Sequence, residues 1–185
     1  MDPNTTAVVL RDGTRAVLRL TEPSDHDAVR RFFHELSPES RQRRFFTLAE
    51  PLEAFVDAFC DSGNLRRQAT LVALSADESA ARPIAIGSYL EVKPGIAEAA
   101  FAVNDAHQGR GLGTILLEQL AAMAAANGFA AFEAIVLPDN SAMLEVFRDS
   151  GFAIHSTSER GAVTVRFPLG PTAASLAAAA RRHPA

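Results

Sequence analysis

The 185-residue sequence contains a single cysteine, Cys60, and no tryptophan. One cysteine excludes an internal disulfide and a zinc site built from four cysteines. The five histidines show no metal-ligand spacing, so we expect no bound metal. Cys60 ends an apolar run with helical spacing that begins at Phe55, which is typical of a buried structural thiol.

The chain is also poor in positive charge and in long apolar runs. Its net charge of −4 and isoelectric point near 5.7 argue against a nucleic-acid partner. No stretch approaches the ~18 apolar residues that a membrane-spanning helix needs. The first four residues, Met-Asp-Pro-Asn, lack the basic and apolar character of a secretory signal. We therefore expect a cytoplasmic protein that binds neither membranes nor nucleic acid.

The most informative stretch is a glycine-rich segment, residues 107–114, which reads His-Gln-Gly-Arg-Gly-Leu-Gly-Thr. An apolar, strand-like run at 99–103 precedes it, and a helical pattern over 115–127 follows. The segment is therefore predicted to enter a helix N-terminus, where unpaired backbone N–H groups and the helix dipole favour an anion. Because Gly111 and Gly113 have no Cβ, a phosphate could approach their backbone closely.

Two common phosphate-binding loops do not match this segment. A P-loop ends in Gly-Lys-Ser/Thr, but the only lysine of the chain is Lys93. A dinucleotide-binding loop has the spacing Gly-x-Gly-x-x-Gly, which Gly109, Gly111 and Gly113 do not have. An ordinary strand-to-helix turn that uses glycine for its shape remains the alternative.

A second motif follows this helix. A strand-like run at 131–137 is broken by Pro138. Asp139 or Asn140 can cap the next helix, whose apolar positions have the spacing of a buried stripe. Gly151 is placed as the glycine that ends that helix.

The pattern Gln108-x-x-Gly111-x-Gly113 resembles the Gln/Arg-x-x-Gly-x-Gly/Ala signature of the GNAT superfamily of N-acetyltransferases, which hold the pyrophosphate of acyl-coenzyme A. The resemblance implies a mixed α/β (α+β) GNAT fold, with a mostly antiparallel central sheet, a splayed parallel strand pair and about four flanking helices. It also implies acetyl-CoA as the acyl donor, without a metal. Asn140 would then touch the pantetheine arm, which is compatible with a role as a plain N-cap. The residues expected to bind the coenzyme are Phe101, Ala102, Val103, Gln108, Gly109, Arg110, Gly111, Leu112, Gly113, Thr114 and Asn140.

Two further stretches look like the GNAT domains of bacterial protein lysine acetyltransferases. They are residues 97–103, Ala-Glu-Ala-Ala-Phe-Ala-Val, and residues 36–46, Leu-Ser-Pro-Glu-Ser-Arg-Gln-Arg-Arg-Phe-Phe. The similarity spans about residues 8–167, and in that family the catalytic glutamate lies at the position of Glu98. Acyl transfer needs a neutral amine, whose proton a carboxylate can take, so Glu98 is the expected general base. From its chemistry alone, Glu98 could equally be a strand-end residue that faces water.

The chain departs from the common GNAT pattern at Phe147, where many members carry a tyrosine as general acid. Its only tyrosine, Tyr89, lies on a different predicted strand. The leaving thiolate therefore takes a proton from water or from the amine, or another acid serves. A thiol pKa near 8.5 makes the thiolate a tolerable leaving group, and the protein lysine acetyltransferases also lack this tyrosine.

Two arginine clusters could pair with the 3′-phosphate of the coenzyme or with an acidic acceptor. A solvated helix face is the favoured interpretation of both clusters. Their members are Arg41, Arg43, Arg44, Arg66 and Arg67.

Residues 1–167 are expected to form a single GNAT domain, followed by an alanine-rich tail at 168–185. The tail is interpreted as mobile, the alternative being a helix that docks on a second subunit and so forms a homodimer. The expected activity is transfer of an acetyl group from acetyl-CoA to a primary amine, with a protein lysine favoured. A small-molecule amine N-acetyltransferase and a non-catalytic acyl-CoA-binding regulator are the alternatives. Glu98 argues against the regulator, and Phe147 keeps it open.

Overall fold

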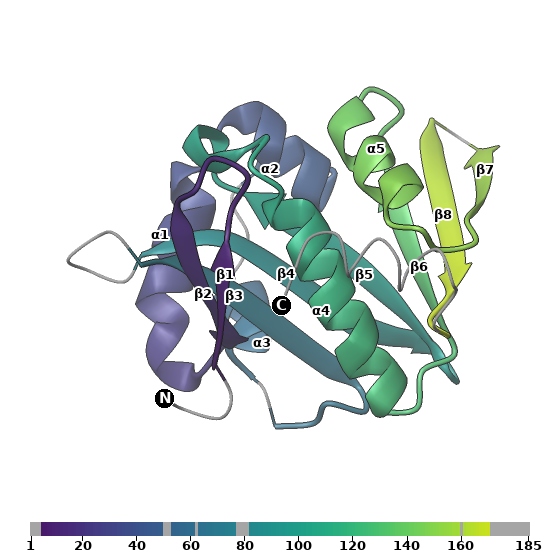
Figure 1. Ribbon diagram of the computed structural model, residues 1–185, viewed down its shortest axis with the longest axis horizontal. Coiled ribbons are helices and arrows are strands. Elements are labelled where there is room, and N and C mark those ends of the chain that lie inside the picture. The colour runs from purple at the N-terminus through teal and green to yellow at the C-terminus, as the bar shows by residue number, and fades with distance from the viewer. Residues whose placement is uncertain (1–4, 50–52, 62, 77–81, 160, 171–185) are drawn as a thin grey trace.

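The computed structural model describes residues 5–49, 53–61, 63–76, 82–159 and 161–170, which form one eight-stranded sheet with helices packed on it (Figure 1). The strands lie in the order β1-β2-β3-β4-β5-β6-β8-β7. Every neighbouring pair is antiparallel except β5 and β6, which confirms the predicted sheet type. The strands are β1 (Thr5–Val9), β2 (Arg15–Leu20), β3 (Gln68–Ser75), β4 (Pro83–Lys93), β5 (Ile96–Val103), β6 (Ala131–Val136), β7 (His155–Glu159) and β8 (Ala162–Pro168).

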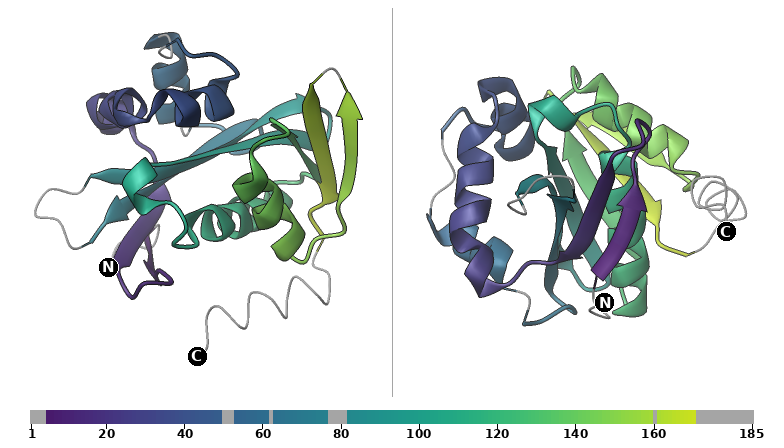
Figure 2. Two further views of the ribbon diagram at one scale, coloured as in Figure 1. Left: turned by 90° about the horizontal axis from the view of Figure 1, so that it is seen from above. Right: turned by 60° about the vertical axis from the view of Figure 1, so that its left-hand side comes forward.

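Helices cover the two faces of the sheet unequally, as the left view of Figure 2 shows. The N-terminal helices α1, α2 and α3 lie on one face, and α4 and α5 lie on the other. The described residues form five α-helices, where about four were expected. The additional helix is α2, which begins separately from α1 because Ser37 caps it and Pro38 starts it. The helices are α1 (His26–Glu35), α2 (Pro38–Phe45), α3 (Glu53–Cys60), α4 (Leu112–Ala126) and α5 (Ser141–Asp149), with 3₁₀ turns at Pro23–Asp25 and Asp105–His107.

Each face of the sheet has its own core. Under α1 and α3, the buried side chains of Phe33 and Val56 pack with Val72 of β3. Under α4, Leu116 and Leu120 pack with strand residues of the larger cluster. Gly87 of β4 faces this helix, and a Cβ there would lie 2.9 Å from the Leu120 Cδ1 atom. Glycine therefore lets α4 lie close against the centre of the sheet.

The parallel strands β5 and β6 pair over a short distance only. Their register contains Ile96 with Ala131, Ala97 with Phe132, and Glu98 with Glu133. Beyond that point β5 continues beside β4, while β6 continues beside β8. The strands therefore separate on the side where the glycine-rich segment lies, which confirms the predicted splay.

Most predicted elements are present, with shifted ends. The helix expected from Ile115 begins at Leu112, and Gly151 follows α5 with a φ of +78°, as a helix-ending glycine does. Cys60 is buried, as predicted. The chain beyond β8 is packed as far as Leu169, whose N–H donates to the carbonyl of Ala130. Residues 171–185 of the predicted tail lie outside the described residues.

Candidate active site

Two adjoining hollows open where β5 and β6 separate. We call the larger one, of about 570 Å³, the strand cavity, and the smaller one, of about 230 Å³, the loop pocket. Both are lined by Arg43, Phe101, Asn140 and Met143. Because they share these side chains, the two hollows form one path from the glycine-rich segment to the sheet.

The loop pocket is walled by the glycine-rich segment at the start of α4. Gly109 and Gly111 have φ values of +75° and +91°, a conformation that side-chain-bearing residues rarely adopt. Gly111 is the N-cap residue of α4, and it lines the loop pocket together with Leu112 and Gly113 of the first helical turn. Of the predicted residues, Ala102, Val103, Gln108, Gly109, Gly111, Leu112, Gly113 and Thr114 line this pocket. The arrangement suits an anionic, phosphate-bearing group.

Gln108 holds the loop in place through its side chain. Its Nε2 donates to Ser40 Oγ at 3.1 Å and to the carbonyl of Val103 at 3.2 Å. Beside it, Asp105 accepts hydrogen bonds from the backbone N–H of Ser37 at 2.9 Å and from Ser40 Oγ at 2.7 Å. Burial alone would raise the pKa of Asp105, but the bonds from Ser37 and Ser40 outweigh it and hold that pKa below its usual range. The loop is thereby fastened to α2.

Arg110, expected to bind the coenzyme, turns away from the loop pocket. Its Nη1 lies 2.9 Å from Asp12 Oδ2, and its Nη2 donates to the carbonyl of Ala106 at 2.8 Å. Arg11 lines the pocket instead, and its Nε lies 3.4 Å from where a Cβ on Gly111 would be. The sequence analysis did not single out Arg11, because this arginine reaches the loop from the β1–β2 turn.

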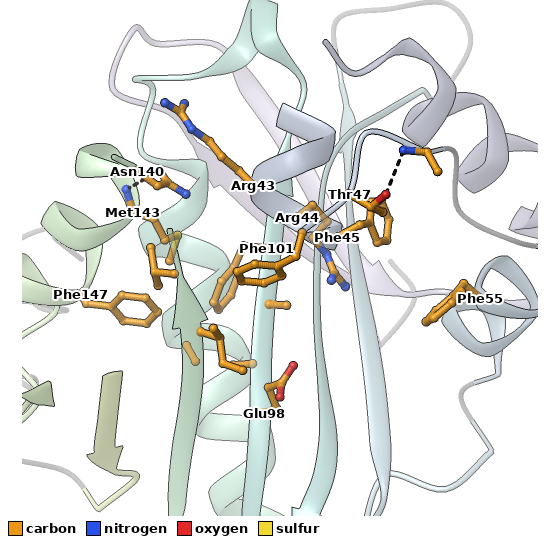
Figure 3. A pocket seen from close by; sticks show the side chains of 17 residues that line it. Arg43, Arg44, Phe45, Thr47, Phe55, Glu98, Phe101, Asn140, Met143 and Phe147 are labelled. Carbon is orange, nitrogen blue, oxygen red and sulfur yellow. Dashed lines mark hydrogen bonds between the residues drawn. The ribbon is translucent and has the colours of Figure 1, made fainter. Parts of the chain in front are cut away.

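The strand cavity lies between β5, β6, α2 and α5 (Figure 3). Glu98 lies on β5 at the last register pair before the two strands separate, and its half-buried side chain lines the cavity. Among the described residues that line this cavity, Glu98 is the only carboxylate. The strand cavity therefore has one carboxylate that can accept a proton, and the other carboxylates of the site, Glu145 and Asp149, line the loop pocket.

Asn140 serves as a helix cap and also lines both hollows. Its Oδ1 accepts a hydrogen bond from the Met143 N–H at 3.2 Å, so its side-chain NH₂ is the donor that a ligand in the path would meet. The two roles considered for this residue are thus compatible.

Neither Phe147 nor Tyr89 supplies an acid to the strand cavity. Phe147 is 1% exposed and lines the cavity with its ring, whose centroid is 6.4 Å from that of Phe101. Tyr89 lies outside the lining of both hollows, and its hydroxyl donates to the carbonyl of Leu65 at 2.6 Å. Burial raises the pKa of Tyr89 to about 12. A thiolate that leaves in this site must therefore find its proton elsewhere.

The interpretation of the first arginine cluster as a solvated helix face is wrong for Arg43 and Arg44, which both line the strand cavity. The guanidinium carbon of Arg44 lies 5.1 Å from the ring centroids of both Phe45 and Phe59, and its Nη2 donates to Ser88 Oγ at 3.1 Å. This contact between α2 and β4 turns the side chain inward.

Arg66 and Arg67 are exposed, as predicted, and line neither hollow, but they lie in the turn before β3 and not on a helix face. The described part of the chain contains no group of three or more His, Cys, Asp or Glu residues suited to a metal ion. It also contains no helix that is long and apolar enough to cross a membrane.

A helix N-terminus that begins at a glycine-rich segment, and that leads between splayed strands to a cavity with one carboxylate, is the arrangement of an acyltransferase site. The chain belongs to the Acetyltransferase (GNAT) family, whose sequence model matches residues 26–152.

Individual relatives agree with this assignment. Acetyltransferase Pat of Mycolicibacterium smegmatis is 30% identical over 167 residues, which are 88% of this chain and 46% of that protein. This chain therefore spans less than half the length of that relative. The crystal structure of the GNAT domain of S. lividans PAT superposes with a TM-score of 0.79 at 33% identity, covering 91% of this chain and 98% of that chain. The structure of yncA from Salmonella typhimurium, with its cofactor acetyl-CoA, has a TM-score of 0.68 at 18% identity and covers 86% and 97% of the two chains.

Proposed function

We propose that this protein transfers an acetyl group from acetyl-CoA to a primary amine, in the first place a protein lysine, with Glu98 as general base. The observation that carries the proposal is the place of Glu98. It is the one carboxylate among the described residues lining the strand cavity, at the point where β5 and β6 separate.

The path through the two hollows supports binding of the donor. The pyrophosphate lies on the amides around Gly111 and Gly113, where the helix dipole also favours it. The pantetheine arm then runs past Phe101, Ala102 and Val103 and meets the amide of Asn140. The thioester ends in the strand cavity near Glu98. The relative from Salmonella typhimurium, solved with acetyl-CoA, has the same fold.

The chemistry requires that the acceptor lose a proton. A lysine ammonium has a pKa of about 10.4, so Glu98 takes its proton, directly or through one water. The neutral nitrogen attacks the thioester carbonyl, a C–N bond forms, and the C–S bond breaks. The thiolate of coenzyme A leaves and is protonated by water or by the proton shed from the amine, since Phe147 cannot donate one.

The rim of the strand cavity supports a protein acceptor. Phe46 and Phe55 line the cavity and are 47% and 52% exposed, and Ile135 is 41% exposed. Exposed apolar side chains gathered at one opening are typical of a surface that another protein covers. A small-molecule amine is the second candidate, because about 570 Å³ is also an ordinary volume for a small-ligand pocket.

The test is thiol release from acetyl-CoA, measured with a panel of lysine peptides and small amines. Glu98→Gln should lower turnover by ~10²–10⁴ and leave acetyl-CoA affinity, measured by calorimetry, nearly unchanged. Glu133→Gln is the matched control, because Glu133 pairs with Glu98 in the strand register but does not line either hollow. Near-normal turnover in Glu98→Gln would remove Glu98 from the mechanism. Tight acetyl-CoA binding without turnover of any amine would favour the regulator instead.

A further inference from the structure

Arg44 is a cation that lines the strand cavity, and no described carboxylate is in ion-pair contact with it. Among the described residues, no carboxylate oxygen is recorded within 4 Å of its guanidinium, and its buried Nε has no hydrogen-bond partner. Arg43, which lines the same cavity, differs from Arg44 in its charge partner and not in its Nε, which also lacks a hydrogen bond. Its Nη2 lies 2.6 Å from Glu39, whereas Arg44 has no such contact. Arg44 is half-buried, and a charge partly withdrawn from water without a carboxylate in contact is costly, so its position here calls for an explanation.

The Arg44 side chain is held in place without that partner. The rings of Phe45 and Phe59 flank it at 5.1 Å, and Ser88 Oγ accepts from its Nη2 at 3.1 Å. Burial lowers the pKa of the guanidinium to about 10, although the negative charge of Glu98 acts in the opposite direction. The group is therefore still a cation at neutral pH, and it is already oriented before a ligand arrives.

The charges that line the cavity indicate which kind of group could pair with the Arg44 guanidinium. Glu98 and Arg44 lie in the same cavity (Figure 3), and together they contribute no net charge. An acceptor that enters as a simple ammonium adds one uncompensated positive charge next to Arg44. An acceptor that also carries a carboxylate adds none, because its ammonium can face Glu98 while its carboxylate faces Arg44.

We propose that Arg44 binds an anionic group, a carboxylate, that the acceptor carries close to its reacting amine. The carboxylate belongs either to a free amino acid-like amine or to an acidic residue beside an acceptor lysine in a protein. The guanidinium provides a fork of N–H donors that matches a carboxylate. This inference rests on the proposed acetyl transfer and narrows its acceptor class.

The test compares acceptors that differ only in this charge. One arm uses 5-aminopentanoate against 5-aminopentanamide. The other uses a blocked peptide with one lysine between two glutamates, against the same peptide with glutamines. For the wild-type protein we expect kcat/KM to favour the carboxylate member of at least one pair by about tenfold to a hundredfold, the usual worth of a hydrogen bond to a charged group. The arm that shows the preference identifies the source of the carboxylate.

In Arg44→Gln, the ratio of kcat/KM for the carboxylate acceptor to kcat/KM for its amide should be close to one, whatever the absolute rates. Arg44→Lys should keep part of it, since the charge remains without the fork. Arg44→Met keeps an unbranched apolar side chain of similar length without the charge, and serves if the glutamine variant does not fold. Arg66→Gln, at an exposed arginine that lines neither hollow, should leave the ratio unchanged.

If Arg44→Gln lowered kcat/KM equally for both acceptors of each pair, the inference would be overturned, because Arg44 would then act through Glu98 or through the fold. A wild-type protein without preference in either arm would overturn it as well. A binding measurement separates this failure from that of the proposed function. Calorimetric titration of 5-aminopentanoate and its amide into the protein saturated with coenzyme A should show tighter carboxylate binding that Arg44→Gln abolishes, even if no amine is turned over.

Discussion

The two halves of the site are built in different ways. One wall of the loop pocket is the backbone of consecutive residues, with Gly111 as N-cap and Gly113 in the first turn of α4, and side chains such as Arg11 and Met143 form the other walls. The acceptor side of the strand cavity consists of long side chains, such as Arg44 and Phe55, from helices that pack across the sheet. A site for a phosphate group needs only exposed amides. Recognition of an amine and its surroundings needs charges and apolar surface brought from several elements.

Asp105 joins the two halves. It lies two residues after the end of β5, and its oxygens accept hydrogen bonds from Ser37 and Ser40 at the start of α2. The helix that carries Arg43 and Arg44 is therefore fixed to the segment that carries Gln108. The geometry of one half depends on the other through this contact.

The largest expected effect is loss of donor binding in Gly113→Glu. A carboxylate in the first turn is compatible with the helix dipole, and a Cβ on Gly113 would meet Val146 Cγ2 at 3.4 Å, an ordinary contact. The fold should survive, while the new charge occupies the place of the pyrophosphate. Calorimetric titration should show acetyl-CoA affinity reduced at least ~10³-fold, since charge repulsion replaces a charge-assisted contact.

Gly113→Ala is the matched control for this prediction, because it adds the Cβ without the charge. It should retain most of the affinity. A folded Gly113→Glu variant with normal affinity would show that the diphosphate does not lie on these amides. Gly111→Glu should also lose binding, but its φ of +91° adds backbone strain to the charge.

The next largest effect concerns a wall of the strand cavity. Phe147 is 1% exposed and packs against Phe101 and Phe167, with ring centroids at 6.4 and 5.7 Å. Phe147→Ala should lower the free energy of unfolding by about 3–5 kcal/mol, because it leaves a cavity in a packed core. Urea unfolding at constant pH measures this change.

Phe147→Tyr examines the missing acid at the same position. We expect turnover within an order of magnitude of wild type, since the thiolate already leaves without a tyrosine. A hundredfold rise in turnover would instead show a site that has lost its acid, and would favour the regulator as the role of the natural protein.

The sequence predicted the loop pocket well for a physical reason. Positive φ at Gly109 and Gly111 restricts those positions to particular residues, so a local geometric need appears as a local pattern. The short pairing of β5 with β6 likewise follows from elements that are adjacent in the motif. The N-cap role of Asn140 was predictable for the same reason, because a capping residue is recognisable from the helix that it starts.

The acceptor side could not be predicted in this way. Arg44 is turned inward by a contact with Ser88, and no local pattern links residues so far apart in the chain. Arg11 lines the loop pocket where Arg110 was expected, and the cause is similar. Asp12 on the β1–β2 turn holds Arg110 away from the pocket. Side chains whose direction depends on long-range packing therefore needed the three-dimensional structure.

A smaller effect is expected where the two halves are joined. Asp105→Asn should lower the free energy of unfolding by about 1 kcal/mol, because one acceptor among several hydrogen bonds is lost at a partly solvated position. The folded-state pKa of Asp105 is below its usual range, so its stabilisation is fully present above the unfolded-state pKa of about 3.9. It is lost as the pH falls through the lower folded-state value.

The stability gap between wild type and Asp105→Asn should therefore be constant from pH 7 to about pH 5 and close below about pH 4. Thermal unfolding over this range measures it. Asp139→Asn, at an exposed carboxylate outside the lining of both hollows, removes the same charge and should leave stability nearly unchanged. A gap that widens on acidification would contradict the assigned role of Asp105.

The smallest expected effect is a difference in acetyl-CoA affinity between variants of Arg11, which lines the loop pocket, and of Arg110, which the motif suggested. Arg11 lies beside Gly111 and is exposed, so its attraction to a coenzyme phosphate is screened by solvent and salt. Arg11→Gln should weaken acetyl-CoA binding only a few-fold, an effect that fades as ionic strength rises. Arg110→Gln should leave the charge next to the phosphate in place, and its effect should appear in stability through the lost contact with Asp12. Calorimetric titration at low and high salt compares the two variants, and a salt-dependent loss in Arg110→Gln with none in Arg11→Gln would reverse the assignment.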